Sequence, residues 1–136
     1  MGPVPWCVGV RTVFCMEPGK AESQLRKGVL EYCVLGLLRE RPRYGIELLK
    51  KLAATGVLAT SQGTVYPLLS RLRRDELVAT SWRESSSGPP RRYYELTETG
   101  TASLRDFTRT WVGFKAAVDE VVLSTDQDQD PASEKS

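Results

Sequence analysis

The residues best suited to chemistry in this sequence are arginines, and the chemistry they offer is the binding of anions. Arg71, Arg73 and Arg74 lie within one helical turn, and Arg91 and Arg92 are adjacent. A guanidinium group presents its N–H donors in a fixed fork, which suits a phosphate or the edge of a guanine. Two neighbouring arginines in a purely structural loop would repel one another, so the pair favours a nearby anion. The alternative interpretation is an ordinary solvated basic surface.

Catalytic and metal chemistry are disfavoured by what the 136 residues lack. There is no histidine, which excludes a Ser-His-Asp triad, a Cys-His nucleophile pair and every zinc site that contains histidine. The three cysteines, Cys7, Cys15 and Cys33, form no CxxC pair and cannot supply four metal ligands. No P-loop, GxGxxG motif or recognisable carboxylate pair is present. We therefore expect no enzyme, no metal site and no cofactor.

Targeting signals are also missing from the sequence. An odd cysteine count argues against a secreted disulfide scaffold and favours a reducing interior. No apolar run approaches the roughly 20 residues of a membrane-spanning helix, and no charged region precedes the apolar N-terminal stretch. We expect a cytoplasmic protein without a membrane partner. Translation starts at Met16, or residues 1–15 form a short disordered arm.

The charge is unevenly distributed along the chain. The net charge of the whole sequence is only +2, but residues 25–96 carry 13 basic and 7 acidic groups, for a net charge of +6. Residues 97–136 carry 4 basic and 8 acidic groups, for a net charge of −4. A basic core followed by an acidic tail favours an anionic partner, plausibly nucleic acid.

Two helices are expected before the arginine-rich segment. The first runs from Leu25 to Glu40 and ends where Pro42 prevents helical geometry. Its expected buried stripe comprises Leu30, Cys33, Val34, Leu37 and Leu38. The second runs from Tyr44 to about Ala54 and closes at Gly56, a left-handed cap. Its expected inward residues are Ile46, Leu49 and Leu52.

A third helix is expected from Ser61, its N-cap, to about Asp75. Its inward stripe comprises Val65, Leu68, Leu69 and Leu72, which remain in phase on both sides of Pro67. At about 100° per residue, the opposite face comprises Gly63, Pro67, Ser70 and Arg74, flanked by Thr64, Tyr66, Arg71 and Arg73. This outward face has small side chains at two positions and a cation at its end. Both features favour close approach of the helix to the edges of bases.

A hairpin and a last helix complete the expected fold. Residues 77–83 and 91–96 are predicted to form two strands joined by a rather long loop at 85–90. Thr97 is the predicted N-cap of the helix that follows. The fold class is mainly α with a small β-hairpin: a winged helix-turn-helix domain over 25–96 plus one C-terminal dimerisation helix over 97–123. Residues 1–24 and the acidic tail at 124–136 are expected to be disordered.

Four motifs in this order resemble the PadR family of bacterial transcriptional regulators: GVLEYCVLGLL at 28–38, YGIEL at 44–48, GTVYPLLSRL at 63–72 and GPPRRYYELT at 88–97. The short C-terminal part is similar to the smaller subgroup of that family. The resemblance implies repression of a nearby operon through operator DNA, relieved by a small ligand or another signal. It also implies that Tyr44 contacts phosphate, that the 63–71 helix reads the groove and that Arg91 and Arg92 contact DNA from the wing. The candidate DNA-binding residues are Tyr44, Ser61, Gln62, Gly63, Thr64, Tyr66, Ser70, Arg71, Arg74, Arg91 and Arg92.

The last helix carries an apolar seam that steps by three and four residues. It comprises Leu104, Phe107, Trp111, Phe114, Val118 and Val121. Such a seam predicts a homodimer contact, and the alternative is that the helix folds back on its own core. Trp111 and Phe114 are also candidates for a planar-ligand pocket between subunits. The rival function is a winged-helix module that binds protein and not DNA.

Overall fold

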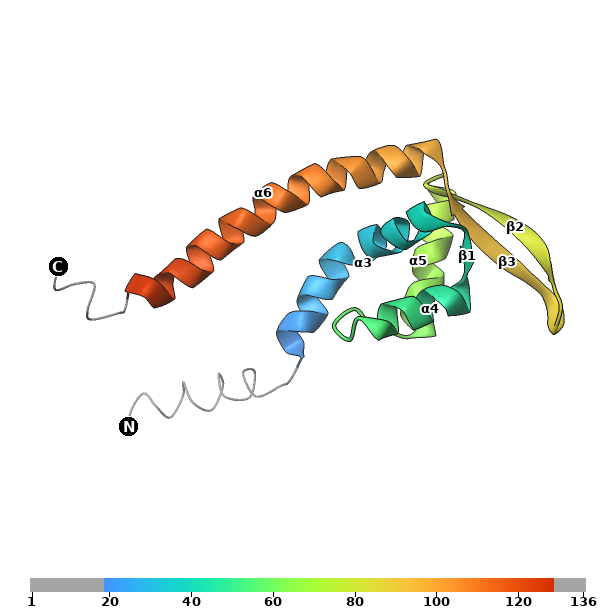
Figure 1. The fold of residues 1–136 in the computed structure, drawn as a ribbon, viewed down its shortest axis with the longest axis horizontal. Helices are drawn as coiled ribbons and strands as arrows, with labels where there is room; N and C mark the ends of the chain where they lie inside the picture. Colours follow the sequence, from blue (N-terminus) through green and yellow to red (C-terminus); the bar gives the residue numbers. More distant parts are fainter. Residues whose placement is uncertain (1–18, 129–136) are drawn as a thin grey trace.

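The computed structural model describes residues 19–128 (Figure 1). Three helices and a small twisted sheet form the body, and a long last helix runs across the first one and past it. The elements are α3 (Lys20–Glu40), β1 (Arg43–Tyr44), α4 (Gly45–Ala54), α5 (Gln62–Arg74), β2 (Val78–Ser85), β3 (Gly88–Leu96) and α6 (Glu98–Asp128). The expected class, mainly helical with a small sheet and a C-terminal helix, is confirmed.

The core lies between α3, α4 and α5 and is closed by the base of the wing. All four residues of the stripe expected on α5 are buried there. The buried hydrophobic residues are Leu30, Val34, Leu35, Leu38, Leu48, Leu52, Val65, Leu68, Leu69, Leu72, Val78, Tyr94 and Leu104. The α3 stripe is shifted slightly from the prediction, because Leu35 is fully buried whereas Cys33 and Leu37 are only partly buried. Partial burial raises the pKa of the Cys33 thiol.

The expected inward face of the second helix is wrong at Ile46, which is exposed. Helix α4 buries Gly45, Leu48 and Leu52, and Leu49 packs at the edge of the core. The reason lies across the helix pair, where the ring of Tyr66 sits directly over Gly45. That contact turns the Gly45 side of α4 toward α5 and leaves Ile46 on the open side. The left-handed closure at Gly56 is confirmed by its φ of 81°.

Two short segments that were predicted to be disordered are helical, because α3 begins earlier and α6 ends later than expected. Helix α3 begins at Lys20, where Gly19 with φ 81° precedes it, so residues 20–24 are helical. The good helix formers Ala21, Glu22 and Gln24 support that extra turn, and Glu22 suits the positive end of the helix dipole. Helix α6 continues through Asp128, so residues 124–128 are helical too. The predictions for residues 1–18 and 129–136 lie outside the described residues.

The sheet has three antiparallel strands in the order β1-β3-β2. Register pairs Tyr44 with Tyr93 on one side of β3, and Arg83 with Arg91 on the other. The longish loop expected at 85–90 is wrong, because β3 begins at Gly88 and only Ser86 and Ser87 form the turn. Pro89 and Pro90 lie inside the strand, and the ladder is irregular between Arg83 and Ser85. Proline favours extended backbone, which explains why the pair lies inside a strand. Proline also has no N–H to donate, which explains why the ladder is irregular beside the pair.

Helix α6 is fixed to the body at its first turn. The hydroxyl of Thr97 accepts a hydrogen bond from the Gly100 N–H at 2.9 Å and donates one to the Glu76 carbonyl at 2.7 Å. The predicted cap at Thr97 is therefore confirmed. Gly100 approaches the Leu77 carbonyl so closely that a Cβ there would lie 2.1 Å from the oxygen. Within residues 19–128, no helix is both long and apolar enough to cross a membrane.

Candidate nucleic-acid interface

The face of α5 that points away from the core is open to solvent. Gly63, Ser70 and Arg74 are exposed along it, as the helical spacing predicts, and the helix continues without interruption through the exposed Pro67. Ser61 is the N-cap by position, but its hydroxyl faces the Thr64 hydroxyl at 3.5 Å and makes no backbone cap. The α5 surface can therefore approach a partner closely, with Arg74 as its cation.

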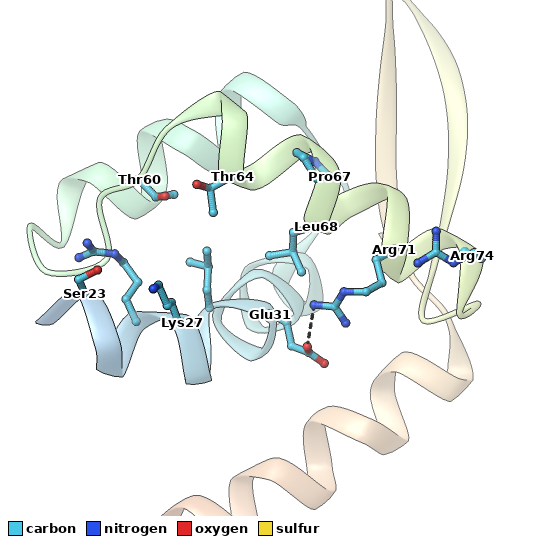
Figure 2. Close-up of a pocket in the computed structure, with 11 residues that line it drawn as sticks. Ser23, Lys27, Glu31, Thr60, Thr64, Pro67, Leu68, Arg71 and Arg74 are labelled. Atoms are coloured by element: carbon cyan, nitrogen blue, oxygen red, sulfur yellow. Dashed lines mark hydrogen bonds and ion pairs between the residues drawn. The ribbon is translucent and has the colours of Figure 1, made fainter. Parts of the chain in front are cut away.

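One edge of α5 faces α3 and is tied to it by an ion pair. The Arg71 guanidinium lies 3.1 Å from the Glu31 carboxylate, as Figure 2 shows. Both side chains are partly exposed, so the pair contributes little to stability. Its effect is positional, because it directs Arg71 toward α3 while Arg74 remains at the exposed end of the helix. The sequence placed both arginines together and gave no sign of this division.

The other edge of α5 faces α4 through Tyr66. A Cβ on residue 45 would lie 2.5 Å from the Tyr66 hydroxyl oxygen, so only glycine fits beneath the ring. Burial, and secondly the charge of Tyr94, raise the pKa of Tyr66. The phenol therefore stays protonated at neutral pH and can donate a hydrogen bond to an anion. The structure places this group beside the start of α4.

Tyr44 joins the start of α4 to the wing. Its ring meets that of Tyr93 edge-on at 5.3 Å, and the Arg91 guanidinium lies 4.4 Å from the Tyr44 ring centre. Arg83 stacks on Tyr93 from the same side of the sheet at 4.5 Å. These cation–π contacts hold two cations in fixed positions along one face of the wing.

Arg92 lies on the opposite face of β3, because successive strand residues alternate. Its guanidinium lies 5.1 Å from the ring of Trp82, which is 65% exposed. The Nε atom of Arg92 is buried without a hydrogen-bond partner among the described residues. The two wing arginines face apart, which limits their mutual repulsion. Both lie inside β3, as the predicted strand at 91–96 requires.

A hollow of about 380 Å³ connects α4, α5 and the wing. It brings together four of the sequence-predicted residues, Tyr44, Tyr66, Arg91 and Arg92. The sequence missed its other charged and aromatic members, Lys50, Trp82 and Tyr94. Trp82 and Arg92 lie opposite each other because of the register between β2 and β3. The sequence did not predict that register.

Arg43 is a second residue whose role the sequence did not reveal. Its side chain is only 2% exposed, donates to the Glu40 carboxylate at 2.6 Å and to the Leu37 carbonyl at 3.1 Å, and lies 3.8 Å from Glu47. These contacts join the end of α3 to the start of α4 and thereby position Tyr44. Sequence reasoning identified the segment only as a helix end.

The apolar seam on α6 is divided between two environments. Leu104 is buried, and Phe107 stacks on Tyr32 of α3 at 4.2 Å between ring centres. The first part of the seam therefore folds back on its own chain. Beyond that point the seam is exposed, with Trp111 at 40%, Phe114 at 60%, Val118 at 43% and Val121 at 70%.

Comparisons with known proteins agree with this geometry. The family described as "Transcriptional regulator PadR-like family" matches residues 34–106. A PadR-like transcription factor from Bacteroides fragilis is 40% identical over 75% of this chain and 98% of its own, with a TM-score of 0.63. A PadR family regulator from Eggerthella lenta is 33% identical over 82% and 96%, with a TM-score of 0.72. A PadR-like regulator from Bacillus cereus is 36% identical over 73% and 96%, with a TM-score of 0.67.

Proposed function

Because the chain belongs to the PadR-like family of transcriptional regulators, we propose that it binds an operator as a homodimer, with α5 in the major groove and the wing against the flanking backbone. The observation that carries this proposal is the outward face of α5. Its small residues Gly63 and Ser70 permit close approach, and Arg74 supplies forked donors at its end.

The wing supplies contacts that position the protein on DNA but do not read sequence. Arg91, held over Tyr44, and Arg92, held over Trp82, present cations on both faces of β3. Tyr44 and the protonated Tyr66 hydroxyl lie beside the same hollow, where a phosphate can accept their hydrogen bonds. The proposed contact set also includes Ser61, Gln62 and Thr64 at the exposed N-terminal end of α5. Arg71, further along the same helix, completes it.

The exposed part of the α6 seam supports the homodimer. Trp111, Phe114 and Val118 form an exposed apolar strip on a helix that the described part of the chain covers only at its start. A second copy that covers the strip would bury this area and place two α5 helices side by side. The operator should then be an inverted repeat with half-sites about 34–36 Å apart, or a multiple of that distance. We further propose that the protein is a cytoplasmic repressor released by a small effector, for which Trp111 and Phe114 between subunits are one candidate contact.

The decisive experiment measures binding of the purified protein to its own upstream DNA across a salt series. Arg74→Ala should cost about 1–3 kcal/mol and relax preference at one position per half-site, if both donors of its fork bind one guanine. Arg105→Ala, a similarly exposed arginine on α6, is the matched control and should bind normally. A footprint without dyad symmetry, or normal binding by Arg74→Ala, would contradict the assignment of α5.

The wing is tested separately through the slope of log K against log salt. Replacing Arg91 and Arg92 with alanine should reduce that slope by about 0.9 for each phosphate that the wing no longer neutralises, with equal weakening on all sequences. An unchanged slope with altered sequence preference would show that the wing reads bases. A folded wild-type protein that binds no DNA would favour the protein-binding module instead.

A further inference from the structure

A second and larger cavity, of about 540 Å³, lies between the N-terminal half of α3 and the edge of α5 (Figure 2). Its size is within the range of sites for small organic ligands. The lining residues come from α3, from the segment before α5 and from α5 itself: Ser23, Arg26, Lys27, Leu30, Glu31, Thr60, Thr64, Pro67, Leu68, Arg71 and Arg74. None of the functions described above uses this cavity.

The lining combines an apolar floor with a cationic rim. Leu30 and Leu68 are buried and form the floor with Pro67, and three hydroxyl-bearing residues also line the space. Four cations and a single carboxylate, Glu31, give the lining a net charge of +3. A neutral apolar ligand would leave these cations unmatched, and a bare inorganic anion would leave the floor uncovered.

Two of the four cations are available to a ligand. Arg26 is committed to the Val57 carbonyl at 2.6 Å, and Arg71 is paired with Glu31. Lys27 and Arg74 form no ion pair with any residue between 19 and 128. They lie on opposite helices, α3 and α5, and both line the cavity. Figure 2 shows them at opposite ends of the lining, with Glu31 and Arg71 between, so an anionic group could pair with either one without breaking an existing ion pair.

We propose that this cavity binds a small organic anion with an apolar body, and that its occupation opposes operator binding. The second part rests on the proposed function, because Thr64, Arg71 and Arg74 belong both to the cavity and to the proposed DNA contacts. A ligand in the cavity would lie against residues of this shared set and hinder their contact with DNA. Coupling of this kind is reciprocal, so DNA must weaken anion binding by the same factor.

Direct binding is tested with 1-anilinonaphthalene-8-sulfonate, an apolar anion, and with N-phenyl-1-naphthylamine, which lacks its sulfonate. The full chain should bind the sulfonate probe more tightly than the neutral one. Lys27→Gln should weaken the sulfonate probe about two- to five-fold, the range expected for one partly exposed charge contact. Lys51→Gln, an exposed lysine of α4 away from the cavity, is the matched control and should bind the probe like wild type.

Glu31→Gln supplies the opposite change. It removes the only carboxylate of the lining and releases Arg71, so the sulfonate probe should bind about two- to five-fold more tightly. Equal affinity for the two probes, or Lys27→Gln and Glu31→Gln variants that bind the sulfonate like wild type, would overturn the site. A probe that binds the apolar strip of α6 instead would have the same affinity for wild type, Lys27→Gln and Glu31→Gln.

Competition with DNA is measured separately, so that the two proposals can fail independently. Saturating sulfonate probe should weaken operator binding by wild type, and less so at the same concentration for Lys27→Gln, which should bind the operator normally without probe. Cavity-dependent probe binding in a chain that binds no DNA would uphold the site and refute the proposed function. Operator binding unaffected by saturating probe would refute the coupling.

Discussion

Helices α5 and α6 carry apolar stripes of similar regularity, yet within residues 19–128 only the stripe on α5 is covered throughout. Val65, Leu69 and Leu72 are fully buried, because α3, α4 and the base of the wing close over them. On α6 the covered part ends near Phe107, and the helix continues beyond the body (Figure 1). The same sequence pattern therefore marks core residues in one helix and exposed residues in the other, where we propose that a second copy binds.

The difference follows from how much apolar surface three short helices can cover. Helix α3 already contributes Leu30, Val34, Leu35 and Leu38 to the core and offers only Tyr32 and its neighbours to α6. An exposed apolar strip of this length is rare on a monomer and marks a surface for association. Stability should thus depend on the α5 stripe, and assembly on the α6 strip.

The largest expected effect is that of truncating a core leucine of α5. Leu69→Ala should lower the free energy of unfolding by about 2–5 kcal/mol, because it removes buried methyl groups and leaves a cavity. Denaturant unfolding at fixed protein concentration measures the change. Val112→Ala, at a position that is 65% exposed on the side of α6 away from the seam, should change stability by less than about 0.5 kcal/mol. Equal destabilisation of the two variants would remove the distinction between the helices.

Truncation within the α6 strip should act on assembly and leave the fold intact. Phe114→Ala should weaken the dimer by at least about 1.5–3 kcal/mol, the value of burying one such side chain. Light scattering across a dilution series reports the shift toward monomer, and far-UV circular dichroism should stay the same. Val112→Ala again serves as control. A wild-type protein that is monomeric at micromolar concentration would refute the proposal that a second copy covers the strip.

The junction between body and α6 is tested by two glycines of the same helix. Gly100→Ala places a Cβ against the Leu77 carbonyl and should destabilise by about 1–3 kcal/mol, as overpacking does. Gly113→Ala meets no atom within 4 Å and should stabilise by up to about 1 kcal/mol through helix propensity. Thermal unfolding of the two variants should therefore move in opposite directions. A stable Gly100→Ala variant would show that α6 is not fixed at this contact.

The smallest expected difference concerns the two N-caps. Thr97→Ala removes a hydrogen bond to Gly100 and one to Glu76, and should cost about 1 kcal/mol. Ser61→Ala should cost less, because the Ser61 hydroxyl contacts only the Thr64 hydroxyl. Chemical denaturation of both variants gives the comparison. A greater destabilisation at Ser61 would mean that its hydroxyl caps α5 in solution.

Periodicity predicted what depends on one element and missed what depends on two. The α5 stripe was predictable because its four residues share one face of one helix. The exposure of Ile46 was not, since the orientation of α4 depends on the close contact between Gly45 and Tyr66 of another helix. The same reason applies to β1, whose two residues show no strand pattern and become a strand only by pairing with β3.

The candidate interface divides in the same way. The exposure of Ser70 and Arg74 follows from helical spacing alone. The commitment of Arg71 to Glu31 joins residues 40 positions apart, and the stacking of Arg92 on Trp82 depends on the register between two strands. Charge runs therefore located the arginines of this surface but not the groups that they contact.

The proline pair in the wing has a consequence for how this protein behaves at high concentration. Strand β3 extends beyond its short partner β1, so the part of its outer edge from Gly88 to Arg92 is open to a strand from another chain. Successive N–H groups point to opposite sides of a strand, so Pro89 and Pro90 together remove one donor from each side. Exposed strand edges are common starting points for aggregation, and missing donors make them poor templates. The prolines therefore make this edge a poor template for pairing, and we expect that replacing the outward-facing one would favour edge-to-edge association.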